Sequence, residues 1–196
     1  MSQGLSKITG KDMAALRPVV ALPAGAAAAV RDCTHVPEAI DRLESGGFLV
    51  EAARLLAHSL PRREAVWWAC MCAAHTAPPD LPEADRQARE AAELWVRQQG
   101  DKNRRAAMRQ AEATSFESPE AWAAVAVFWS GETIGAEDQP AVPPPPHVAG
   151  KAVAGSVALA AVRTDPKRQA IRLKRFLESG RNIAAGGSGR LAAEDA

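Results

Sequence analysis

The chain has 196 residues, which is long enough for one domain with a buried core. Its formal net charge of +1 gives no overall field that would attract nucleic acid or an acidic membrane surface. The chain is rich in alanine, has no tyrosine and has only 5% aromatic residues, so its composition favours helices over strands.

The N-terminal residues 1–33 are expected to form a flexible tail, because their Gly, Ser, Pro and Ala residues leave no apolar stripe. Pro23 and Gly25 interrupt the stretch from Val19 to Val30, which makes it a poor signal peptide. The three cysteines are an odd number and do not form a closed disulfide framework, so a reducing compartment is expected. We therefore predict a cytoplasmic protein.

Residues 34–185 are predicted to form a single all-α domain, followed by a flexible C-terminal tail at residues 186–196. A proline followed by an acid opens several apolar-periodic segments, as at Pro119-Glu120, and this pair suits the first turn of a helix. Helices are predicted at residues 37–44, 48–58, 61–75, 82–98, 102–113, 119–130, 147–163 and 166–184. No segment alternates apolar and polar residues as a half-buried strand does, so no sheet is predicted.

The apolar pattern separates interior helices from surface helices. Segments 119–130 and 147–163 are apolar nearly all round and are expected to be interior, whereas 82–98 has a single apolar stripe. Most connections are short, which favours an up-and-down bundle of about seven or eight antiparallel helices, or stacked helical hairpins. The longest apolar stretch, from Val148 to Val162, is too short to cross a bilayer and contains Lys151, so no membrane insertion is expected.

A long loop at residues 131–146 interrupts this pattern and ends in four consecutive prolines: Pro143, Pro144, Pro145 and Pro146. Consecutive prolines adopt a stiff polyproline II rod without internal hydrogen bonds. The rod is either a rigid crossover between two buried helices or a ligand for an aromatic groove on a partner.

The sequence contains no recognisable catalytic or cofactor-binding constellation. Cys72 and His75 are three residues apart on one helix and could chelate a soft metal, but no C-x-x-C pair or other zinc spacing accompanies them. Free cysteines in an apolar run are typical of a core. The acids of segment 82–98 lie among arginines and are expected to form surface salt bridges. No catalytic residue, metal ligand or cofactor is therefore predicted.

Basic residues cluster at two places in the helical domain, at residues 102–109 and on the last helix, where Arg168, Arg172 and Arg175 lie opposite its apolar face. The pair Arg62 and Arg63 opens another helix. Such a face is either simply solvated or a surface for an acidic partner. Nucleic acid is not expected as the partner, because the chain is neutral overall and no stacking aromatics are interleaved.

Two adjacent tryptophans, Trp67 and Trp68, point to diverging faces of segment 61–75. Either the helix is buried on two sides, or one face is packed inside and the other is presented to a partner. Because tryptophan and arginine often carry interface energy, Trp68 is a candidate anchor for a partner.

Three segments of the chain, LPRREAVWWACMC, SPEAWAAVAVFWSG and PPPPHVAGKAVAGSVALAAV, resemble an uncharacterised family of small helical bacterial proteins. Members of that family occur beside components of type VI secretion systems. The resemblance covers roughly residues 34–185 and brings no catalytic residues. It implies a partner or co-chaperone of the chaperone that loads a toxic effector onto a PAAR-type spike tip.

The resemblance and the residue patterns together predict a non-enzymatic protein-binding module, an adaptor or co-chaperone for a type VI secretion effector. Its partner is expected to be a chaperone, an effector or a spike-tip protein. The candidate partner-binding residues are Trp68, Arg62, Arg63, Arg168, Arg172, Arg175, Pro143, Pro144, Pro145 and Pro146. Two alternatives stay open: a self-associating structural helical protein, and a metal-binding or enzymatic protein whose site assembles from distant residues.

Overall fold

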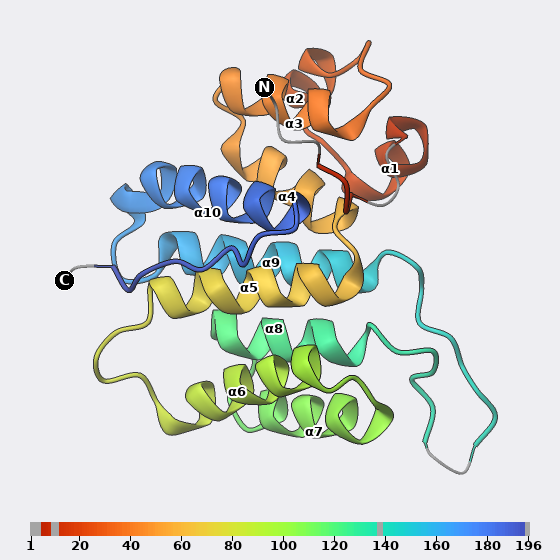
Figure 1. Cartoon of the computed structure of the whole chain (residues 1–196), viewed down its shortest axis with the longest axis vertical. Coiled ribbons are helices and arrows are strands. Elements are labelled where there is room, and N and C mark those ends of the chain that lie inside the picture. The colour runs from red at the N-terminus through yellow and green to blue at the C-terminus, as the bar shows by residue number, and fades with distance from the viewer. Residues whose placement is uncertain (1–4, 9–11, 137–138, 195–196) are drawn as a thin grey trace.

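The computed structural model describes residues 5–8, 12–136 and 139–194 (Figure 1). These residues form ten α-helices and one 3-10 turn, with no strand among them, so the prediction of a single-domain all-α bundle is confirmed. The helices are α1 (Met13–Val20), α2 (Ala24–Ala29), α3 (Val36–Ser45), α4 (Leu49–Ser59), α5 (Arg62–His75), α6 (Glu83–Arg97), α7 (Asp101–Glu112), α8 (Pro119–Phe128), α9 (Val148–Val162) and α10 (Gln169–Ala184), and the 3-10 turn η1 is Pro166–Arg168.

The predicted helices correspond to α3 to α10, with ends that nearly coincide. Local chemistry explains several of these ends. At the start of α8 the Ser118 hydroxyl accepts a hydrogen bond from the Ala121 amide at 3.1 Å, which satisfies one of the free N–H groups of the first turn. The last predicted helix starts later than expected, because Pro166–Arg168 forms the separate 3-10 turn.

The expectation of a flexible N-terminal tail is wrong for residues 12–33, which form α1 and α2 and pack against the bundle. The side chains of Met13 and Val30 are buried in the common core. The guanidinium of Arg17 donates hydrogen bonds to the carbonyls of Val30, Arg31 and Cys33 at 3.0, 2.9 and 2.8 Å. Residues 1–4 and 9–11 of the expected tail lie outside the described residues.

The expectation of a flexible C-terminal tail is also wrong for residues 186–194. After α10 the chain turns back and runs along α5 and α10 (Figure 1). The indole N–H of Trp67 donates to the Ser188 carbonyl at 2.7 Å, and the Glu194 amide donates to the His75 carbonyl at 2.7 Å. Residues 195–196 lie outside the described residues.

The interior of the bundle is built around α8 and α9, as predicted from their apolar residues. Helix α9 packs against α4, α5 and α8, and α6 and α7 cover the other side of α8 (Figure 1). Helix α1 packs against α4. No helix among the described residues is long and apolar enough to cross a membrane.

Candidate binding pocket

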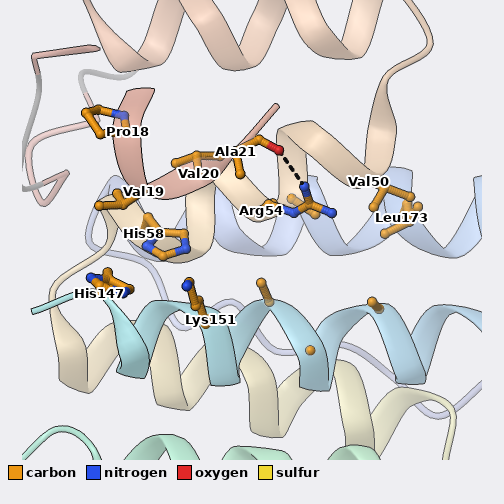
Figure 2. Close-up of a pocket in the computed structure, with 14 residues that line it drawn as sticks. Pro18, Val19, Val20, Ala21, Val50, Arg54, His58, His147, Lys151 and Leu173 are labelled. Carbon is orange, nitrogen blue, oxygen red and sulfur yellow. Dashed lines mark hydrogen bonds between the residues drawn. The ribbon is translucent and has the colours of Figure 1, made fainter. Parts of the chain in front are cut away.

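A pocket with a volume of about 440 Å³ lies where α1, α4 and α9 meet (Figure 2). The floor is formed by Ala154, Gly155 and Ala158 of α9. Because these side chains are small, they leave the space above them open. The apolar lining consists of Pro18, Val19, Val20, Ala21, Val50, Ala53, Ala154, Gly155, Ala158 and Leu173. The pocket is therefore mainly apolar in its walls and floor, as small-ligand and side-chain pockets commonly are.

The polar lining of the pocket is entirely basic. Arg54 and His58 are four residues apart on α4, and His147 and Lys151 are four residues apart at the start of α9, so each pair shares one helix face. Figure 2 shows His58, His147 and Lys151 gathered at one end of the pocket. No carboxylate lines the pocket, and none of these four side chains forms an ion pair within the described part of the chain.

Two contacts fix the basic side chains of α4. Arg54 donates a hydrogen bond to the Ala21 carbonyl at 3.3 Å, where Ala21 ends α1 with a positive φ of 49° (Figure 2). The ring of His58 lies directly against Gly150, since a Cβ on that glycine would be 2.5 Å from His58 Nδ1. Glycine at this position therefore provides the space that the imidazole occupies.

The charge of His58 depends on its surroundings. Burial lowers the pKa of His58 from 6.5 to about 4, and the positive charges of His147, Lys151 and Arg54 act in the same direction. His58 is consequently uncharged at neutral pH. An anion bound at this end would favour the imidazolium form, so its binding would raise the pKa of His58 and take up a proton. This end of the pocket therefore places basic side chains beside apolar walls.

Two of the sequence-predicted partner residues, Trp68 and Arg172, lie in the interior and not on an open surface. Trp68 is 0% exposed, and its indole N–H donates to the Phe176 carbonyl at 2.8 Å. Arg172 is 2% exposed, and its guanidinium is bound by Glu194 and by the carbonyl of Arg163. The helical periodicity placed Arg172 on the polar face correctly, but the C-terminal segment covers that face.

The other predicted partner residues lie nearer the surface. Arg62 and Arg63 are exposed, but their guanidinium groups donate to the carbonyls of Ser130 and Val96 at 3.0 and 2.9 Å. Arg168 is partly buried and pairs with Glu194 at 3.0 Å. Among the remaining residues, Arg175, Pro143, Pro145 and Pro146 are exposed and Pro144 is partly buried.

The structure brings together Arg62 and Pro146, which line a smaller pocket of about 190 Å³ together with His58. It does not bring them to Arg168 and Arg172, whose common partner is the C-terminal Glu194. The predicted residues therefore do not form one surface.

Sequence reasoning missed the basic end of the pocket. Its signal was present as two basic pairs, Arg54 with His58 and His147 with Lys151, each spaced by one helical turn. Nothing in the sequence showed that these two helix faces meet, because the long loop 131–146 separates α9 from the preceding helix.

The possible metal pair, Cys72 and His75, is buried in the bundle. Cys72 is fully buried, and burial raises the pKa of its thiol well above the usual value. His75 Nδ1 hydrogen-bonds with the Ala192 carbonyl. Among the described residues, no group of three or more His, Cys, Asp and Glu side chains is placed to hold a metal ion.

Comparison with known families gives a match that spans most of the bundle. A family model described as a family of unknown function, DUF6931, matches residues 39–184. The chain belongs to the DUF6931 family. The DUF6931 segment includes α4 and α9, hence the floor and basic end of the pocket, but not α1. No curated protein and no solved structure matches the chain.

Proposed function

We propose that the protein is a non-enzymatic binding module that holds a partner protein by a segment carrying an acidic side chain next to apolar ones. The observation that supports this most directly is the pocket between α1, α4 and α9, where four basic side chains adjoin apolar walls. The partner's acid pairs with the basic end, and its apolar side chain is buried beside Val19 and Val50.

Both halves of the pocket contribute to binding such a segment. Full burial of one large aliphatic side chain is worth about 1.5–3 kcal/mol. A carboxylate at the basic end meets Lys151, which has no carboxylate partner among the described residues, so no existing ion pair has to be broken. An acid and a leucine-sized residue together fit a pocket of about 440 Å³.

The resemblance to proteins that occur beside type VI secretion components supports a partner of that kind. In this proposal the protein acts as an adaptor or co-chaperone, and the bound segment belongs to the chaperone, the effector or the spike-tip protein. An adaptor of this type binds reversibly, which suits a small pocket rather than an extensive buried interface.

The test compares capture by the wild-type chain with capture by pocket variants, using tagged protein in the native bacterium followed by calorimetry with the purified partner. Lys151→Glu reverses charge at the basic end, and Ala154→Phe fills the floor. We expect each substitution to weaken the partner's affinity by at least about tenfold, equivalent to about 1.4 kcal/mol. Lys102→Glu on α7 and Ala170→Phe on α10 are matched controls, because both side chains are exposed away from the pocket.

Two outcomes would contradict the proposal. Equal affinity for all four variants would show that the partner binds elsewhere. Recovery of this chain alone, together with a mass that rises with concentration, would favour self-association instead.

A further inference from the structure

The C-terminal segment 187–194 is bound along α5 and α10 in the manner of an extended peptide in a groove. Side chains of the helices bind its backbone: Asn182 accepts from the Gly189 amide at 2.8 Å, Ser179 donates to the Gly189 carbonyl at 2.5 Å, and Trp67 donates to the Ser188 carbonyl at 2.7 Å. At the other end the Glu194 amide donates to the His75 carbonyl at 2.7 Å. We call this segment the strap.

Two side chains anchor the strap. Leu191 is partly buried and packs against the core. The Glu194 carboxylate lies 2.7 Å from a guanidinium nitrogen of Arg172 and 3.0 Å from one of Arg168. Burial opposes the charge of Glu194, but the hydrogen bond from Arg172 and the charges of Arg172 and Arg168 keep its pKa below the usual value. The strap is thus held by one apolar residue and, three positions later, one acid.

The helices that form the groove also contact each other directly. Beneath it, α5 and α10 pack directly on each other, with Trp68 bonded to the Phe176 carbonyl and His75 in edge contact with the Phe176 ring at 5.9 Å. These contacts join the two helices and involve no atom of the strap, although His75 Nδ1 also hydrogen-bonds with the strap carbonyl of Ala192. The residues that bind the strap lie within the DUF6931 segment 39–184, whereas the strap itself lies outside it.

The strap fits the groove incompletely. Ser188, Arg190, Ala192 and Ala193 are exposed, so little of the segment is buried. His75 is 4% exposed, and its Nε2 has no hydrogen-bond partner among the described residues. Gly186, with a positive φ of 96°, links the strap to α10 and allows the chain direction to change there.

We propose that the groove between α5 and α10 is a docking site for an extended segment of a partner protein, with a leucine-sized residue three positions before an acid, and that the strap is its displaceable resident. The partner's acid takes the place of Glu194 between Arg172 and Arg168, and its apolar residue takes the place of Leu191. This second surface goes beyond the pocket between α1, α4 and α9 and does not rest on it.

The test uses the full chain and a fluorescent peptide with the sequence of residues 187–194, GSGRLAAE. In a loosened chain carrying Leu191→Ser and Glu194→Gln, the resident strap competes less. We expect fluorescence anisotropy to show at least about tenfold tighter binding to the loosened chain than to the wild type. A peptide with the same two substitutions should not bind. Arg172→Gln in the loosened chain should abolish binding, whereas Lys174→Gln, an exposed residue of α10, should leave it unchanged.

The proposal is overturned if the peptide does not bind to a loosened chain that keeps the wild-type circular dichroism spectrum. If the loosened chain does not fold, hydrogen exchange on the wild type decides instead: we expect the Glu194 amide to exchange faster than the amides in the middle of α10. Exchange of that amide only with global unfolding would make the strap a fixed part of the fold. A wild-type dimer that the peptide dissociates would assign the groove to a second copy.

Discussion

His58 lies where burial and neighbouring positive charges both disfavour its protonated form. Histidine in the unfolded chain has a pKa of 6.5, and the fold lowers it to about 4. Between these values the unfolded chain binds the proton more readily than the folded chain does. The free energy of unfolding therefore does not depend on His58 above about pH 6.5, and it decreases as the pH falls from about 6.5 to 4.

This linkage predicts the effect of His58→Asn. We expect the wild type to lose about 1–2 kcal/mol more stability than the variant between pH 7 and pH 4.5, a figure reduced to allow for partial exposure of the ring. Urea unfolding at the two pH values measures the difference. His35→Asn, at an exposed histidine, is the control. Identical pH dependence in the wild type and His58→Asn would show that the imidazole is not desolvated in the fold.

At the scale of elements, the buried pair Glu120–Arg163 ties the start of α8 to the end of α9. Glu120 is 0% exposed, and the Arg163 guanidinium donates to its carboxylate at 3.0 Å and to the Ala73 carbonyl of α5 at 3.3 Å. One arginine thus links three helices. Removal of one partner of a buried pair leaves the other charge without compensation, which costs more than the loss of both.

We therefore expect Glu120→Ala to lower the free energy of unfolding by about 3 kcal/mol. The double variant Glu120→Ala with Arg163→Met should recover much of that loss, because no unpaired charge remains. Chemical denaturation of the wild type, both single variants and the double variant gives the coupling energy. Additive effects of the two substitutions would contradict the proposed link.

Glu120 also illustrates how far sequence reasoning reaches at this scale. Its place after Pro119 correctly marked the start of a helix, because that signal is local. Its partner Arg163 is 43 residues further along the chain, and no local pattern indicates that contact. The same limit applies to the pocket, since its basic pairs on α4 and α9 are each visible in the sequence but their meeting is not.

The two N-terminal helices were missed for a different reason. Helix α1 has eight residues with Pro18 inside, and α2 has six residues that are all Ala or Gly. Helix α1 has apolar residues at helical spacing, Met13, Leu16 and Val20, but Pro18 and the short length obscure that pattern, and α2 has no apolar periodicity at all. These two helices are held in place by tertiary contacts. Met13 and Ala26 are buried in the core, and Arg17 donates hydrogen bonds to three backbone carbonyls.

At the scale of the whole molecule, the N-terminal helices belong to the same core as the bundle. Met13 of α1, at 1% exposed, lies in one continuous cluster with residues of α4, α5 and α10. A side chain in a shared core contributes to the unfolding of the whole domain rather than of one segment. The N-terminal region therefore should not unfold independently.

We expect Met13→Ala to lower the free energy of global unfolding by about 2–4 kcal/mol, the usual cost of such a truncation in a core. Thermal or urea unfolding, followed by the near-ultraviolet signal of the bundle's tryptophans, reports on this value. Ala15→Ser, at an exposed position of α1, is the control. An unchanged transition for Met13→Ala would mean that α1 adds nothing to the stability of the bundle.

The position of α1 relative to the family match has a consequence for selectivity. The basic end and floor of the pocket lie within residues 39–184, whereas the wall formed by α1 comes from residues before that segment. Arg54, His58, His147 and Lys151 lie inside the family segment, whereas Pro18, Val19, Val20 and Ala21 precede it. In the proposed function, the groups that pair with the acid therefore all belong to the family segment, while part of the apolar wall is contributed by residues ahead of it.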